Sequence, residues 1–224
     1  DRRQRQMCIR DRTELAKPMK HDEWIAHIKT LGGERKYVEP AKGTVNPRVF
    51  IDKLAKKMPA NVTVVADVGQ NQIWTCTEYK FRKEGRLLTS GGMGTMGYSV
   101  PAAIGAKMAD DSRATVAICG DGAFQMSFME LATAVQFGVD IKVVVMTNNR
   151  LGMVRELQTN GYHDRQTAVF LDGSPDFIKL AEAYGIPAMR VYDDDTMEKG
   201  IEMLAEHKGI CLVEVVVDKD MPTL

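Results

Sequence analysis

Short apolar runs alternate along most of the chain with stretches in which apolar residues recur every three or four positions. The runs are rich in β-branched residues, as strands buried on both faces are. They predict strands at 62–68, 86–90, 115–119, 141–147, 188–193 and 211–218. The periodic stretches predict helices at 46–58, 71–81, 98–109, 125–137, 151–158, 175–184 and 196–207. This alternation predicts an α/β fold, a parallel sheet flanked by helices on both faces.

The regular pattern begins at Asn46 and predicts one large domain over residues 46–224. Residues 13–45 hold a short helical pattern and then a stretch rich in Gly and Pro, which is typical of a linker. We interpret them as the tail of a preceding segment followed by a linker. Residues 1–12 are dense in arginine and have no apolar period, and we interpret them as a non-native or disordered arm.

Composition and charge exclude several classes of function. Lys plus Arg equals Asp plus Glu at 30 each among 224 residues, so the chain lacks the basic footprint of a nucleic-acid-binding protein. No apolar run approaches the ~20 residues that a membrane helix needs. The four cysteines are scattered without metal-ligand spacing. Cys119 and Cys211 lie in apolar runs, so we expect buried free thiols and a cytoplasmic protein.

Two of the predicted strands are followed by polar residues. Asp121 follows strand 115–119 in the sequence GDGAF, and Asn148 follows strand 141–147 in the sequence TNN. In a parallel α/β sheet, ligands collect at the carboxyl ends of the strands. Carboxylate and amide oxygens, together with the phosphates of a ligand, are what Mg²⁺ prefers. The spacing therefore favours a magnesium site at this edge of the sheet.

The neighbours of these two residues suit a phosphorylated ligand. The backbone carbonyl of Arg150 would add a third oxygen, and Gly120 and Gly122 would let a diphosphate approach the backbone and the next helix. The alternative is structural: Asp121 caps the following helix, and Asn148 forms an Asx turn.

The sequence GMGTMG at 92–97 is a literal GxGxxG. Such a loop can hold the pyrophosphate of a dinucleotide, with Asp121 then placed to bind the ribose. A tight glycine-rich turn against a helix, or close approach of the backbone to another phosphorylated ligand, would use the same residues.

Residues 120–149, GDGAFQMSFMELATAVQFGVDIKVVVMTNN, resemble the thiamine diphosphate motif, which opens with GDG and closes with NN. Over about 46–218, the order DVGQNQIW, TSGGMGTMGYSVPAAIGAKMA and NNRLGMVRELQ is similar to the C-terminal domain of the acetolactate (acetohydroxyacid) synthase catalytic subunit. The resemblance implies the thiamine-diphosphate-binding fold. It also implies a carboligation of two pyruvates, or of pyruvate and 2-oxobutyrate, with loss of CO₂, in branched-chain amino-acid synthesis. The alternatives are another thiamine-diphosphate-dependent 2-oxoacid decarboxylase or carboligase, and a non-catalytic dinucleotide-binding module.

The resemblance also implies a set of site residues. Asp121, Asn148 and the carbonyl of Arg150 would hold Mg²⁺. Gly94 would accept a hydrogen bond from the aminopyrimidine of the cofactor, and Met96 would hold the cofactor bent. The other residues expected at the cofactor are Val68, Gly69, Gln70, Asn71, Thr95, Gly120, Gly122, Ala123, Gly152, Met153 and Val154.

Met153 and Leu157 would lie at the substrate end of this site. The family commonly has Trp where this chain has Leu157, and that Trp helps to recognise 2-oxobutyrate, so Leu157 favours pyruvate as the second substrate. The family also has His in place of Asn71 and often Ser in place of Ala123.

The resemblance finally implies that the chain is a fragment, inactive alone. In the family, the glutamate that activates the cofactor lies on an N-terminal domain and FAD is bound mostly by a middle domain, so we expect no catalytic side chain here. The full-length enzyme would be a homodimer or tetramer, with which a small regulatory subunit can associate.

Overall fold

The computed structural model describes residues 20–31, 37–82 and 84–224, and the chain divides into two compact units, one ending at residue 36 and one spanning Tyr37–Leu224. The first unit contains helix α2 (Asp22–Leu31), none of whose residues is buried. The interpretation of residues 1–12 as an arm lies outside the described residues. In the described part of the chain, no helix is both long and apolar enough to cross a membrane.

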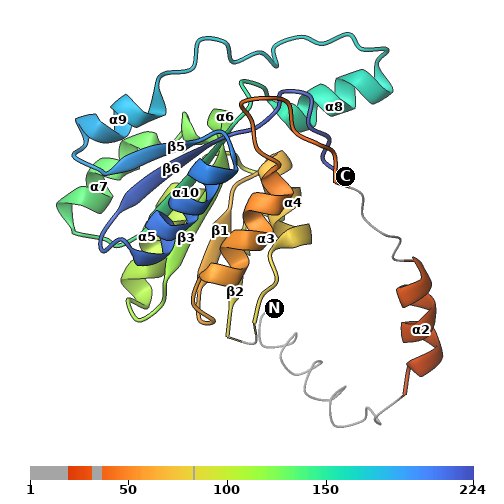
Figure 1. Ribbon diagram of the computed structural model, residues 1–224, viewed down its shortest axis with the longest axis horizontal. Coiled ribbons are helices and arrows are strands. Elements are labelled where there is room, and N and C mark those ends of the chain that lie inside the picture. The colour runs from red at the N-terminus through yellow and green to blue at the C-terminus, as the bar shows by residue number, and fades with distance from the viewer. Residues whose placement is uncertain (1–19, 32–36, 83) are drawn as a thin grey trace, which may run out of the picture. The chain divides into compact units, whose positions relative to one another are not determined.

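The second unit is built on a six-stranded parallel sheet in the order β2-β1-β3-β4-β6-β5 (Figure 1). This confirms the predicted α/β fold. The strands are β1 (Thr63–Ala66), β2 (Arg86–Thr89), β3 (Thr115–Gly120), β4 (Lys142–Thr147), β5 (Ala188–Val191) and β6 (Cys211–Val216). Residues 37–45 belong to this unit: Val45 is buried, and its N–H donates to the carbonyl of Val216 at 2.9 Å.

Helices cover both faces of the sheet (Figure 1). They are α3 (Pro47–Lys57), α4 (Gln70–Glu78), α5 (Ser99–Ala109), α6 (Asp121–Phe124), α7 (Leu131–Gln136), α8 (Gly152–Gly161), α9 (Phe177–Ala183) and α10 (Asp194–Glu206), with a 3₁₀ turn at Phe128–Glu130. Neighbouring strand residues serve opposite faces: Val64 packs in the core under α3, α4 and α10, and Val65 packs in the core under α5, α7 and α9. Both valines are fully buried, and each such side chain stabilises the fold by about 2 kcal/mol.

The sequence after β3 departs from the prediction of one continuous helix over 125–137. The chain enters the short helix α6 at Asp121, directly at the end of the strand. Ser127 then leaves the helical region with φ −144°, and α7 begins only at Leu131. The prediction was wrong here because the apolar period of α7 continues through a turn whose backbone is not α-helical.

The carboxyl ends of β1, β3 and β4 lie side by side at one edge of the sheet. Ala66 pairs with Ile118, and Gly120 pairs with Met146. The loops that follow these strands therefore begin at the same edge, where ligands bind in open α/β sheets.

Candidate cofactor and metal site

Asp121 joins the loops of two neighbouring strands. Its carboxylate accepts hydrogen bonds from the N–H groups of Gly122, Asn148 and Asn149, at 2.8, 3.2 and 2.7 Å. The residue is only 2% exposed. Burial raises the pKa of Asp121 to about 6, although the backbone hydrogen bonds act in the opposite direction. A bound cation would offset this desolvation of the carboxylate.

Asn148 presents its amide between two partners. Its Oδ1 accepts a hydrogen bond from the N–H of Arg150 at 3.1 Å, which is the Asx turn considered above. Its Nδ2 donates to Oε1 of Gln70 at 3.1 Å. Asn149, between the two turn residues, is left-handed with φ 54°. The turn thus curls the 148–150 backbone around the amide oxygen, which remains available to a second donor or a cation because an amide oxygen has two lone pairs.

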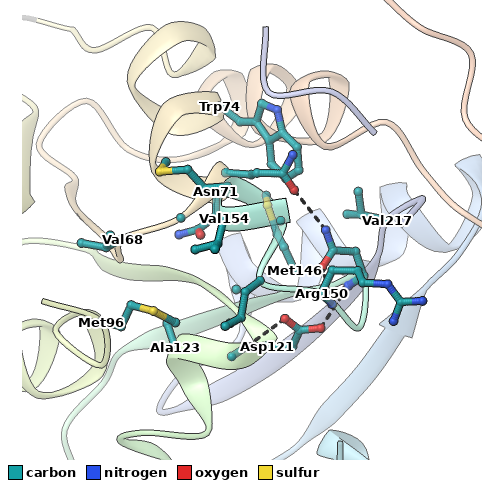
Figure 2. A pocket seen from close by; sticks show the side chains of 18 residues that line it. Val68, Asn71, Trp74, Met96, Asp121, Ala123, Met146, Arg150, Val154 and Val217 are labelled. Atoms are coloured by element: carbon teal, nitrogen blue, oxygen red, sulfur yellow. Dashed lines mark hydrogen bonds between the residues drawn. The ribbon is translucent and has the colours of Figure 1, made fainter. Parts of the chain in front are cut away.

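A cleft that is partly open to solvent lies at this edge of the sheet (Figure 2). Most of the predicted cofactor residues line it: Val68, Gly69, Gln70, Asn71, Met96, Gly120, Asp121, Gly122, Ala123, Asn148, Arg150, Gly152, Met153 and Val154. Gly94 and Thr95 lie in the exposed turn before Met96, outside this lining. Leu157 is also outside it and is 62% exposed.

Four apolar lining residues were not expected from the sequence: Trp74, Leu151, Met146 and Val217. Met146 is the next-to-last residue of strand β4, and Val217 directly follows β6. Their place at strand ends was the signal that could have found them, since this rim of the sheet forms the site.

The cleft has features that suit an anion such as a diphosphate. Helices α4 and α8 begin at its lining residues Gln70 and Gly152, and neither has a side-chain cap. Uncapped helix starts offer free N–H groups and the positive end of the helix dipole to an anion. Gly69, which precedes α4, has φ 144°, a conformation that favours glycine.

The GMGTMG loop is held in place by Asp67, at the end of β1. The buried Asp67 carboxylate accepts hydrogen bonds from the N–H groups of Gly97 and Ser99 at 3.0 and 2.7 Å. The methyl carbon of Met96 comes within 3.5 Å of the position that a Cβ on Gly122 would occupy. The loop therefore carries Met96 across to the Asp121 loop.

Arg150 reaches the site through its backbone. Its guanidinium lies over the ring of Phe170, 4.7 Å from the centroid, and pairs with Asp172 at 2.7 Å. Figure 2 shows the side chain extending away from Asp121. The N–H groups of Leu151 and Leu171 donate across the two segments, to the carbonyls of Val169 and Asn149, both at 2.9 Å. Segment 169–172 thus clamps the loop that follows β4.

Comparison with known proteins places this architecture in a family. Residues 67–215 match the family described as "Thiamine pyrophosphate enzyme, C-terminal TPP binding domain". The chain belongs to this family. The match confirms the resemblance found in the sequence, and it confirms thiamine diphosphate (thiamine pyrophosphate) as the cofactor of the domain.

The curated relatives carry a narrower name. The chain is 39% identical over 185 residues to "Acetolactate synthase catalytic subunit, mitochondrial" of Aspergillus candidus, covering 81% of this chain and 26% of the relative. It is 38% identical over 181 residues to "Acetolactate synthase large subunit" of Lactococcus lactis, covering 81% and 31%. It is 33% identical over 207 residues to "Acetolactate synthase isozyme 2 large subunit" of Escherichia coli, covering 92% and 38%. The chain therefore spans between 26% and 38% of the length of these relatives.

Proposed function

We propose that this chain forms the diphosphate- and metal-binding part of an acetolactate synthase. The reaction would condense two pyruvates, or pyruvate and 2-oxobutyrate, with loss of CO₂, in branched-chain amino-acid synthesis. The observation that carries the proposal is the joining of Asp121 to the Asn148 loop at the ends of neighbouring strands. The names of the relatives favour acetolactate synthesis over another thiamine-diphosphate-dependent reaction.

In this proposal, Mg²⁺ is held by the Asp121 carboxylate, the amide oxygen of Asn148 and the backbone carbonyl of Arg150. The donor set is all oxygen and carries one negative charge, and the phosphates of the cofactor supply the rest, as is usual for Mg²⁺. The buried carboxylate supports the assignment, because a cation would restore the favourable electrostatics that it loses by desolvation.

Thiamine diphosphate, when bound, supplies the carbon nucleophile of the carboligation. The residues of this chain bind and orient it. The starts of α4 and α8 would hold the diphosphate, and Met96 would support the ring system from the side of Gly122. Among the described residues that line the cleft, Asp121 is the only carboxylic acid. In this proposal it is a ligand of Mg²⁺. We therefore assign no proton-transfer step to a side chain of this chain.

Further proposals concern the whole protein. The relatives are named large or catalytic subunits, so we propose a homodimer or tetramer of the whole chain and association with a small regulatory subunit. FAD would be bound mostly outside the residues of this chain. The free thiols of the buried Cys119 and Cys211 support a reducing compartment such as the cytoplasm.

The reaction is tested with a hybrid of the Lactococcus lactis large subunit in which this chain replaces the matched region. We expect acetolactate as the main product from pyruvate, and loss of activity when the hybrid carries Asp121→Ala. Asp111→Ala, at an exposed position, is the matched control. Acetaldehyde as the main product would favour a decarboxylase instead.

The dinucleotide alternative is tested on the chain itself. Binding of NAD(H) that survives EDTA would support it, whereas binding of thiamine diphosphate that requires a metal must be lost with EDTA.

A further inference from the structure

We propose that Glu156 and Thr223 are positioning residues that fix the orientation of the Asn148 amide and so present its oxygen to the metal. The inference rests on the proposed function, because it concerns a ligand of the proposed Mg²⁺ site. Neither residue lines the cleft, and both act through Gln70.

A continuous chain of hydrogen bonds connects these residues. The N–H of Thr223 donates to Oε1 of Glu156 at 2.7 Å, and the Thr223 hydroxyl donates to Oε2 of the same carboxylate. Nε2 of Gln70 donates to the Thr223 hydroxyl at 3.1 Å and to the carbonyl of Met221 at 2.9 Å. Nδ2 of Asn148 then donates to Oε1 of Gln70 at 3.1 Å.

The carboxylate of Glu156 sets the donor-to-acceptor direction of these hydrogen bonds. An ionised carboxylate only accepts hydrogen bonds, so the single hydroxyl hydrogen of Thr223 points to Glu156. The Thr223 oxygen is then an acceptor on its other side, and so is the carbonyl of Met221. Gln70 must therefore turn its NH₂ group toward both of them.

The orientation of Gln70 decides that of Asn148. With its NH₂ group turned toward Thr223, Gln70 has its oxygen facing Asn148. Asn148 must therefore donate a hydrogen bond from its own NH₂ group. The amide oxygen of Asn148 is left on the opposite side, toward the N–H of Arg150. The two ends of an amide have nearly the same shape, so hydrogen-bond partners decide which end faces which way. Reversing the direction of these hydrogen bonds would turn the NH₂ group of Asn148 toward the cation.

The packing around Gln70 keeps this series of hydrogen bonds in place. Gln70 is 4% exposed and Thr223 is 9% exposed. The indole N–H of Trp74 donates to the carbonyl of Pro222 at 3.1 Å, which anchors segment 221–223. A Cβ on Gly152 would lie 1.8 Å from Oε1 of Gln70, so the glycine is required for Gln70 to lie where it does. Gln70 is buried and is paired at both ends of its amide, so its amide holds a single arrangement.

The test compares three substitutions. Thr223→Val keeps the shape of the side chain and removes the hydroxyl, whereas Thr223→Ser keeps the hydroxyl. Glu156→Gln can offer an NH₂ donor to Thr223, which frees the direction of the hydroxyl and leaves the carbonyl of Met221 alone to orient Gln70. The control is Glu182→Gln, at an exposed position of α9.

The first measurement is the Mg²⁺ concentration that supports binding of thiamine diphosphate to the chain, by calorimetry. We expect Thr223→Val and Glu156→Gln to need about tenfold more Mg²⁺, as is typical when a residue that orients a metal ligand is changed. Thr223→Ser and Glu182→Gln should match the parent. A merely structural role would lower the unfolding midpoint of Thr223→Val and leave its Mg²⁺ requirement unchanged, and that result would overturn the inference alone.

The second measurement needs no metal. The side-chain NH₂ signals of Gln70 and Asn148 are recorded by ¹H–¹⁵N NMR, and we expect them to move in Thr223→Val and Glu156→Gln but not in Thr223→Ser. If the parent shows no metal-dependent binding, the proposed function is contradicted and these signals still decide the orientation. Unmoved signals would overturn the inference whatever the binding result.

Discussion

Replacing a glycine with alanine at the start of a helix ordinarily stabilises a protein. Gly152 is the first residue of α8, and its φ lies outside the left-handed region. Alanine there should gain up to about 1 kcal/mol from helix propensity and from the restriction of the unfolded chain. In this structure, however, the new Cβ would lie 1.8 Å from Oε1 and 2.5 Å from Cδ of Gln70. The Gln70 side chain would have to leave its position.

The cost follows from the hydrogen bonds of Gln70. Its displacement breaks the bonds to Met221 and Thr223 and the bond from Asn148. At about 1 kcal/mol for each bond, the loss is roughly 3 kcal/mol, which outweighs the gain from alanine. We expect the free energy of unfolding of Gly152→Ala to fall by about 2 kcal/mol.

Urea unfolding followed by circular dichroism measures this change. The matched control is Gly105→Ala in α5, where the residue is exposed and a Cβ would meet no atom within 4 Å. We expect the control to be stabilised by about 0.5–1 kcal/mol. If Gly152→Ala is as stable as Gly105→Ala, then Gln70 is not held as described, and the reasoning about its contacts is refuted.

Three further predictions concern other parts of the molecule. Phe170→Ala removes the ring beneath the Arg150 guanidinium; we expect severalfold weaker Mg²⁺-dependent cofactor binding by calorimetry, and unchanged binding would contradict a clamping role. The Asp193 cap of α10 has its pKa lowered, first by the hydroxyl of its capping-box partner. Its stabilisation is therefore complete above the unfolded pKa and is lost as pH falls through the folded value. Asp193→Asn should reduce the acid sensitivity of the urea midpoint between pH 5 and 3, and an unchanged pH dependence would count against this. Leu157 lies one helical turn beyond Met153 on α8, so Leu157→Trp should extend an aromatic ring toward the cleft mouth and raise the share of 2-oxobutyrate product in the hybrid. An unchanged product ratio would place Leu157 outside the substrate end.

The fold and the centre of the site follow from local features of the sequence. The continuous apolar strands required burial on both faces, and so helices on both sides of a parallel sheet. Asp121 and Asn148 could be placed together because each directly follows a strand. Neighbouring strand ends then bring them to one edge, whatever fills the rest of the molecule.

Other parts of the site depend on contacts between residues far apart in the sequence, which no local sequence pattern predicts. Gln70 meets Met221 and Thr223 at the other end of the chain. Phe170 packs on Arg150 across a loop whose sequence has no apolar period. The broken helix after Asp121 was missed for a related reason, since no Gly or Pro marks the turn at Ser127.

The most direct test of the central claim is calorimetric titration of thiamine diphosphate into the chain, with Mg²⁺ and with EDTA, for the parent and for Asp121→Asn. The asparagine keeps one oxygen for the N–H groups of Asn148 and Asn149, which donate to a single oxygen of Asp121, and its NH₂ group replaces the acceptor of the Gly122 N–H. Because burial raises the pKa of Asp121 to about 6, removing the buried charge should offset the lost bond from Gly122, and the fold should stay about as stable at neutral pH. We expect binding that requires Mg²⁺ in the parent and is lost in Asp121→Asn with no fall in the urea midpoint. Binding that persists in EDTA, or that Asp121→Asn retains in full, would contradict a metal–diphosphate site at the ends of β3 and β4.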